Sequence, residues 1–195
     1  MNHIKLFENF TNHPLINLEN QLMKYSIPIQ YWGTGQAKTI EHLLDEIDNE
    51  ECIIKDEGGY LVRYIEFVGI RILYKDKDNN TWLLKEDRQE FKDGRIRRRD
   101  MQSSVSEKMK SGENPLVSAV RGIEEELSVK IESSQLIKLR PVYYNGGSQS
   151  YPGLKTKYIG HQFTCYLTPE QFVENGYVEI QKDKSTFFKW VKRDN

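Results

Sequence analysis

Three adjacent glutamates stand beside an arginine and a glycine in the sequence AVRGIEEELSV, residues 119–129. On a helix that turns about 100° per residue, Glu125 and Glu126 share one exposed strip with Arg121, and Gly122 lies between them. Two carboxylates beside a residue without a side chain offer oxygen ligands to a divalent cation. They leave coordination positions open, as Mg²⁺ requires when it also binds a substrate phosphate. A solvated acidic face would give the same pattern, so the helix alone leaves both interpretations open.

The helix that carries these residues has a clear predicted start at Asn114 and Pro115. The asparagine side chain caps a free N–H of the first turn, and proline loses nothing there because it has no N–H. We therefore predict a helix from Pro115 to about Leu127, with Glu124 on the side away from Glu125 and Glu126. Its apolar residues fall on one arc, which predicts the buried face. These residues are Leu116, Ala119, Val120, Ile123 and Leu127.

The longer segment EKMKSGENPLVSAVRGIEEELSV, residues 107–129, resembles a degenerate Nudix box. The usual form of that box is G-x5-E-x7-R-E-U-x-E-E-x-G-U, where U is aliphatic. The residues that match it without a gap are Glu113, Arg121, Ile123, Glu125, Glu126 and Val129. Three positions depart from it: the opening glycine is Glu107, the glutamate after the arginine is Gly122, and the closing glycine is Ser128.

The resemblance implies an α+β fold, the Nudix α/β/α sandwich with a mixed sheet, over residues 56–195. Residues 1–55 would be an N-terminal accessory segment with a helix of its own. The implied activity is hydrolysis of a diphosphate linkage in a nucleoside diphosphate derivative, with Mg²⁺ as the cofactor and Mn²⁺ as a substitute. The rival hypothesis is a Nudix-fold module that has lost catalysis and binds a nucleotide or a protein.

The same resemblance assigns roles to single residues. Glu125 and Glu126 would be the metal ligands, and together with Arg121 they would form the catalytic set. Arg121 would hold the glutamates in place by charge-assisted hydrogen bonds, and Glu113 would brace the loop against the helix. Gly122 leaves one acid of the usual pattern missing. The candidates to replace it are Glu107, Glu174, Glu179 and His161.

Substrate contacts are expected from the basic stretch KDGRIRRRD before the box and from tyrosines of a later loop. We expect Arg97, Arg99 and Lys108 to contact phosphates, and Tyr144 to stack on a base. A chain with a net charge of -1 has no global field that attracts a polyanion, so nucleic acid is not the expected partner. The expected partner is a small nucleotide derivative.

The elements around the box are mainly strands. Alternating and β-branched residues predict strands at residues 60–74, 81–91, 136–144, 156–167 and 185–191, with a hairpin turn at 75–80. Helical spacing of apolar residues predicts a helix at residues 37–47. Thr168 followed by Pro169 predicts a further short helix over residues 168–175.

The composition indicates the cellular compartment in which we expect the protein. The two cysteines, Cys52 and Cys165, have no partner nearby in sequence and are expected to be small core residues in a reducing compartment. No apolar run approaches the roughly 18 to 20 residues that span a bilayer, and the N-terminus lacks a signal-peptide pattern. We expect a cytoplasmic protein without a membrane partner, in which residues 1–55 pack beside the site or form a homodimer interface.

Overall fold

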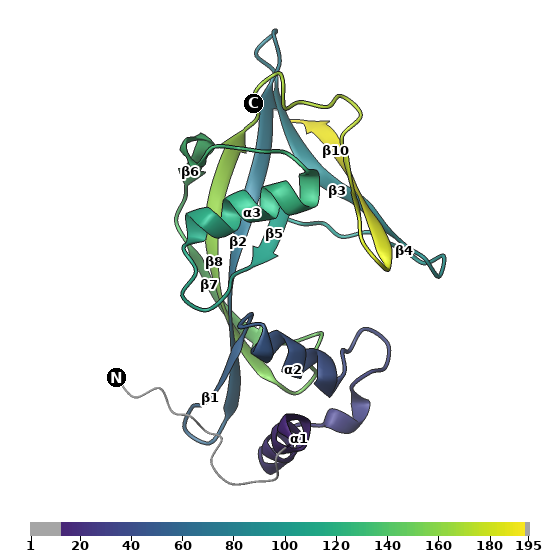
Figure 1. Ribbon diagram of the computed structural model, residues 1–195, viewed down its shortest axis with the longest axis vertical. Coiled ribbons are helices and arrows are strands. Elements are labelled where there is room, and N and C mark those ends of the chain that lie inside the picture. Colours follow the sequence, from purple (N-terminus) through teal and green to yellow (C-terminus); the bar gives the residue numbers. More distant parts are fainter. Residues whose placement is uncertain (1–12, 194–195) are drawn as a thin grey trace. The chain divides into compact units, whose positions relative to one another are not determined.

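The computed structural model describes residues 13–193, and contacts divide the chain into two compact units (Figure 1). The first unit contains the described residues up to Glu66 together with Tyr143–Ile159, and the second contains Phe67–Val142 together with the chain from Gly160 onward. The segment Tyr143–Ile159 therefore belongs with the N-terminal residues by contact. The domain boundary expected at residue 55 stays a prediction.

The elements of the first unit begin with α1 (Pro14–Lys24), the 3-10 turn η1 (Ile29–Tyr31), α2 (Ile40–Asp48) and β1 (Ile53–Asp56). Strands β2 (Leu61–Lys75), β7 (Val142–Gly147) and β8 (Lys155–Tyr166) each have residues in both units. The remaining elements belong to the second unit. They are β3 (Thr81–Phe91), β4 (Ile96–Arg97), β5 (Val105–Lys108), α3 (Pro115–Leu127), the 3-10 turn η2 (Ser133–Gln135), β6 (Leu136–Lys138), β9 (Tyr177–Ile180) and β10 (Lys184–Lys192).

The sheet of the second unit has the strand order β6-β8-β2-β3-β10-β9, with β5 paired to β2 and β4 to β3. Strand β3 is antiparallel to β2 and to β10. By contrast, β2 and β8 run parallel: Gly69 approaches Gln162, and further along both strands the Leu167 N–H donates to the Leu73 carbonyl at 2.8 Å. The sheet is therefore mixed, and the predicted α+β class is confirmed.

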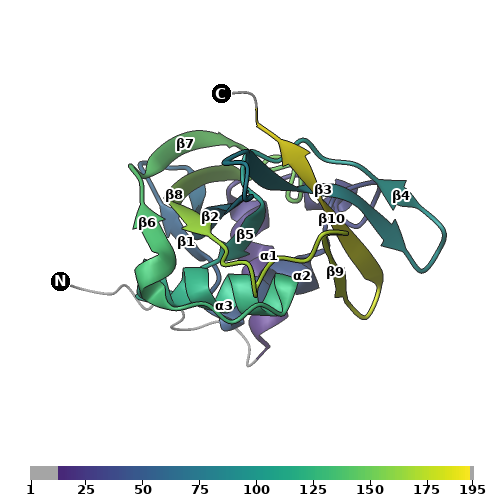
Figure 2. The same ribbon diagram turned by 90° about the horizontal axis from the view of Figure 1, so that it is seen from above.

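Helix α3 covers one face of this sheet and contacts both β5 and β9 (Figures 1 and 2). Its buried residues Ala119, Ile123 and Leu127 pack into one core with residues of β2 and β8. The core residues of those two strands are Val68, Ile70, Ile72, Phe163 and Cys165. This packing fixes which side of α3 faces β5, and so positions the charged residues of the helix.

The first unit has a separate core built on α1 and α2. Leu18, Leu22 and Leu43 are fully buried there, as is Tyr151 from the segment that returns to this unit. Helix α2 is the one predicted at residues 37–47, and it begins after Thr39, whose hydroxyl accepts from the backbone N–H of the third helical residue. Helix α1 was not predicted from the sequence.

Two sequence predictions of secondary structure are wrong. Residues 168–175 form turns instead of a helix. Two carbonyls of this segment accept from side chains later in the chain: the Tyr177 hydroxyl donates to Gln171 O at 2.5 Å, and Trp190 Nε1 donates to Val173 O at 2.9 Å. The strand predicted at 136–144 is divided into β6 and β7. The hairpin turn at 75–80 and both buried, free cysteines are as expected.

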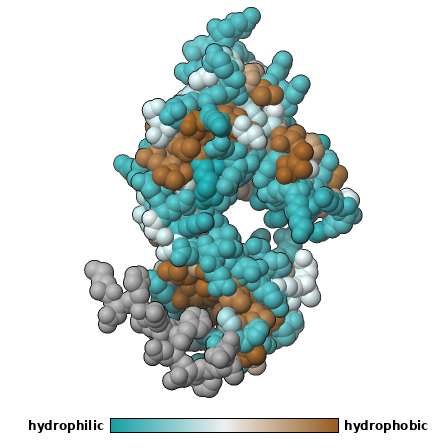
Figure 3. Space-filling model, in the orientation of Figure 1, coloured by the Kyte–Doolittle hydropathy of each residue, from teal (hydrophilic) through white to brown (hydrophobic). Residues whose placement is uncertain are grey.

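The surface shown in Figure 3 is mainly hydrophilic, with hydrophobic residues gathered in separate patches. Within residues 13–193, no helix has the length and apolar composition needed to span a membrane.

Candidate functional site

Helix α3 begins and ends as its sequence dictates. The Asn114 side chain accepts a hydrogen bond from the Leu116 N–H at 2.9 Å, and Pro115 is the first helical residue. The helix ends at Ser128, whose φ of 56° is left-handed and whose N–H donates to Glu124 O at 2.9 Å. Left-handed backbone favours glycine, which is the residue that the Nudix pattern has at this position.

Gly122 faces strand β5, and the expectation that it lies on an exposed strip is wrong. The residue is buried, and a Cβ atom at this position would lie 2.9 Å from Glu107 Cβ and 3.4 Å from Glu107 Cγ. A Cβ atom does not approach another heavy atom within 3.0 Å in proteins. Gly122 is therefore required by the side chain of Glu107, which occupies the space beside the helix.

Arg121 lies at the centre of a network of carboxylates. Its Nη1 donates to Glu107 at 2.9 Å and to Glu125 at 3.3 Å, while Nε and Nη2 contact Glu113 at 3.3 and 3.2 Å. Nη2 also donates to the Lys108 carbonyl oxygen at 3.2 Å. Partial burial opposes the charge of the guanidinium, but its hydrogen bonds with Glu113 and Glu107 raise the pKa of Arg121 further above its ordinary value.

Glu113 braces the loop before α3, as the sequence predicts. One carboxylate oxygen accepts the Lys110 N–H at 3.0 Å and both oxygens contact Arg121. Burial acts to raise the pKa of Glu113, yet the backbone hydrogen bond and the arginine together lower it. Glu113 is therefore an ionised partner of Arg121 at neutral pH.

Glu126 is partly buried among other carboxylates. Its burial, followed by the negative charges of Glu179 and Glu107, raises the pKa of Glu126 from 4.5 to about 8. A hydrogen bond from the Ser106 backbone and the charge of Arg99 oppose this rise. Because α3 contacts β5 and β9, the fold brings Glu107 and Glu179 to Glu126 from two different strands.

Among the other candidates for the missing acid, Glu179 also acts on Glu126, since its charge raises the same pKa. Glu174 lines a different cavity, of about 400 Å³, with Tyr74, Trp82, Phe172 and Trp190. His161 lies in β8. Glu179 is tied to its own strand end, since its carboxylate accepts from Gln181 Nε2 at 2.6 Å.

Arg99 extends the site on its basic side. Its Nε donates to the buried carboxylate of Glu86 at 2.9 Å, and a second contact joins the same two side chains. The hydrogen bonds with Glu86 are the main cause of the raised pKa of Arg99, and the charges of Glu126 and Glu179 add to it. Arg99 therefore faces the carboxylate cluster and offsets part of its charge.

The rest of the basic stretch is largely balanced by acids. Arg95 binds Asp93 at 2.7 Å, and Arg98 lies 3.3 Å from Asp87. Arg97 is exposed in the short strand β4. These ion pairs reduce the field of Arg95 and Arg98.

Two of the expected substrate contacts lie in different units. Lys108 is partly buried in β5, next in sequence to Glu107. Tyr144 belongs to the first unit, where its ring stacks on Tyr158 with the centroids 4.5 Å apart. The contact expected between Tyr144 and a base stays a prediction.

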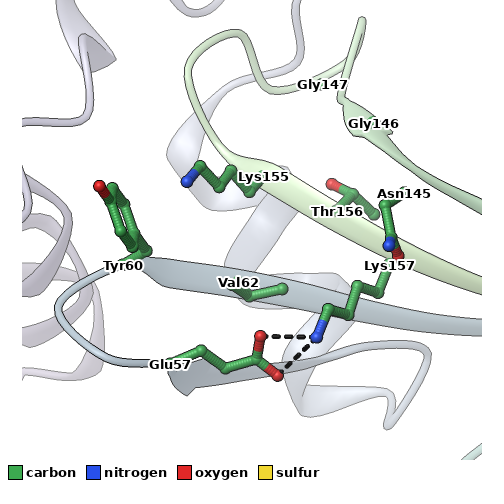
Figure 4. Close-up of a pocket in the computed structure, with 9 residues that line it drawn as sticks. All are labelled: Glu57, Tyr60, Val62, Asn145, Gly146, Gly147, Lys155, Thr156 and Lys157. Carbon is green, nitrogen blue, oxygen red and sulfur yellow. Dashed lines mark hydrogen bonds and ion pairs between the residues drawn. The ribbon is translucent and has the colours of Figure 1, made fainter.

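A cavity of about 510 Å³ in the first unit has a different character (Figure 4). Lys157 donates to both oxygens of Glu57 there, at 2.9 and 2.6 Å, and the ammonium of Lys155 lies 3.3 Å from the centre of the Tyr60 ring. Lys157 is paired with a carboxylate, whereas the contact of Lys155 with a neutral ring leaves a positive charge in this cavity.

The carboxylate cluster fits a divalent cation in chemistry and is not a finished cage. Burial, followed by the neighbouring negative charges, raises the pKa of Glu126 to about 8, and a divalent cation would compensate those charges. In the described part of the chain, no three His, Cys, Asp or Glu side chains are already placed to hold a metal ion. Mg²⁺ commonly binds through one or two carboxylates, water and substrate phosphate, so a partly formed site suits it.

Comparisons with known proteins give structural likeness only. No family model matches the sequence, and no curated protein matches it either. A MutT/Nudix family protein from Enterococcus faecalis is similar in structure, with a TM-score of 0.46 and 12% identity over 96% of this chain. This chain spans 58% of the length of that protein.

Two further solved structures are similar over smaller parts. The Nudix domain of NrtR from Shewanella oneidensis, solved with ADP-ribose, has a TM-score of 0.42 and 12% identity over 76% of this chain and 82% of its own. The dihydroneopterin triphosphate pyrophosphohydrolase of E. coli has a TM-score of 0.39 and 17% identity over 65% of this chain and 79% of its own. Nudix proteins are thus among the structures that this chain resembles.

Proposed function

We propose that this protein hydrolyses a diphosphate linkage in a nucleoside diphosphate derivative and uses Mg²⁺ to do so. The observation that carries the proposal is the cluster of carboxylates around Glu126, whose pKa is raised to about 8 beside a fixed arginine network. Such clustered negative charge costs stability without a counterion, and pKa shifts of this size concentrate at functional sites.

Glu126 is the first metal ligand in this proposal. Its carboxyl group holds a proton near neutral pH and must release it when a cation binds, so cation binding should strengthen as the pH rises. Glu125 is the second ligand expected from the sequence. Its side chain is 56% exposed and only weakly held by Arg121 at 3.3 Å, so it is free to turn toward a cation.

The remaining residues position these ligands and receive the substrate. Arg121 ties the helix to the loop through Glu113 and to β5 through Glu107, so the carboxylates keep their places. The bound Mg²⁺ would polarise a phosphate oxygen and lower the pKa of a water molecule. Arg99 faces the same cluster, and Arg97 and Lys108 are the further cations proposed to contact phosphate oxygens.

The proposal is tested by product release across a substrate panel with Mg²⁺ and then Mn²⁺. The panel contains ADP-ribose, NADH, dinucleoside polyphosphates, nucleotide sugars and nucleoside triphosphates. Glu126→Gln removes the charge and keeps the shape, and Glu124→Gln is the matched control on the exposed side of the same helix. Turnover in the parent and the control, together with its loss in Glu126→Gln, supports the proposal.

A binding module is the second candidate, favoured by one observation: Gly122 follows Arg121 where the Nudix pattern has an acid. This candidate predicts that a compound of the panel raises the melting temperature and yields no product. Steady turnover would rule it out.

A further inference from the structure

Glu107 and Gly122 depart from the Nudix pattern in complementary ways. The pattern has glycine where this chain has Glu107, and it has glutamate where this chain has Gly122. In the structure the two residues are direct neighbours, because β5 contacts α3 at this point and the Cβ position of Gly122 lies 2.9 Å from Glu107 Cβ. The space that a side chain on the helix would need is filled by a side chain from the strand.

The Glu107 carboxylate also reaches the charged groups of the candidate site. It accepts from Arg121 Nη1 at 2.9 Å, and the same nitrogen donates to the Glu125 carboxylate at 3.3 Å. Its side chain is 29% exposed, so water or a ligand has access to it. Glu107 thus lies beside Glu125, one of the two proposed metal ligands.

We propose that Glu107 supplies from strand β5 the cation-facing carboxylate that Gly122 does not supply from helix α3. The proposal rests on the function proposed above and assigns one more residue to that site. Compared with the Nudix pattern, this chain has the acid on the strand and the glycine on the helix. The site then requires glycine at position 122, because any larger residue there displaces Glu107.

Binding of Mn²⁺, measured by electron paramagnetic resonance of the free ion, tests this assignment without a substrate. Glu107→Gln should weaken the affinity for Mn²⁺ by about 10- to 100-fold, the range found when groups that support a metal site are removed. Glu124→Gln should bind Mn²⁺ like the parent. Melting temperature and circular dichroism are recorded for each variant to show that it is folded.

A transposed pair provides the sharper test. Glu107→Gly alone should lose affinity like Glu107→Gln, and the double variant Glu107→Gly with Gly122→Glu should regain affinity, because the acid returns to the helix and its space is open. Gly122→Ala should also weaken binding although every acid is kept, since its Cβ pushes Glu107 aside.

Three results would overturn the assignment. They are parent-like Mn²⁺ binding in folded Glu107→Gln, a double variant that binds no better than Glu107→Gly, and a parent protein that binds no Mn²⁺. Failure of the proposed function would look different. In that case the panel shows no turnover, while Mn²⁺ binding still depends on Glu107 as described.

Discussion

Replacing Gly122 with alanine should destabilise the protein although alanine is the better helix former. Alanine in a helix interior is favoured over glycine by about 1 kcal/mol. Against this gain stands the contact at 2.9 Å with Glu107 Cβ, an atom attached directly to the backbone of β5, so that the side chain cannot simply rotate away. Overpacking of this kind costs about 1–3 kcal/mol. The net loss in free energy of unfolding should be about 0–2 kcal/mol.

The sign of the effect should reverse when Glu107 is absent. In a Glu107→Gly background the nearest remaining atom is Val105 Cγ1 at 3.6 Å, which is an ordinary contact. Gly122→Ala should then stabilise the fold by about 1 kcal/mol through helix propensity alone. The two substitutions therefore have a coupling energy of about 1–3 kcal/mol, within the range for residues in contact.

Urea unfolding of the parent, both single variants and the double variant measures this coupling, with the m-value checked for constancy. The reasoning is refuted if Gly122→Ala stabilises the protein equally in both backgrounds. That result would mean that Glu107 does not occupy the space beside Gly122.

Three further predictions test separate parts of the structure. Glu126 has a pKa of about 8 in the folded protein against 4.5 in the unfolded chain, so the free energy of unfolding should fall as the pH rises from about 4.5 to 8, on the order of a few kcal/mol in all. Urea unfolding at several pH values should show a smaller fall in Glu126→Gln. Equal slopes in the two proteins would contradict the raised pKa. Glu46→Ala leaves the buried guanidinium of Arg63 without its carboxylate and should cost about 3–5 kcal/mol in the free energy of unfolding, whereas a loss below about 1 kcal/mol would show that the pair is not buried. Arg99→Ala should be similarly costly because it leaves the buried carboxylate of Glu86 without its partner. Replacement of the exposed Arg97 by alanine should change the free energy of unfolding by less than about 0.5 kcal/mol. Equal thermal stability of these two variants would count against the site as described.

Local patterns in the sequence predicted the elements that carry the site. The start of α3 at Asn114 and Pro115 is a cap that depends on adjacent residues, and the long strands β2, β3, β8 and β10 have patterns of their own. The helix predicted at residues 168–175 is wrong: its start signal is local, whereas Tyr177 and Trp190, which donate to backbone carbonyls of this segment, come from later strands.

The burial of Gly122 could not be predicted in the same way. Apolar periodicity locates the face of a helix that meets a core, but a glycine has no hydrophobic signal, and strand β5 is four residues long with two charged side chains. The contact between Glu107 and Gly122 depends on how β5 pairs with β2, which no local pattern specifies. The raised pKa of Glu126 was missed for a related reason, since Glu179 arrives from a strand more than fifty residues later.

The most direct test of metal-dependent hydrolysis at Glu126 is product release in Mg²⁺. It compares the parent protein, Glu126→Gln and the control Glu124→Gln. We predict turnover of at least one nucleoside diphosphate derivative by the parent and the control, and none by folded Glu126→Gln. Equal turnover in all three proteins, or none in the parent with any compound or either metal, would contradict it.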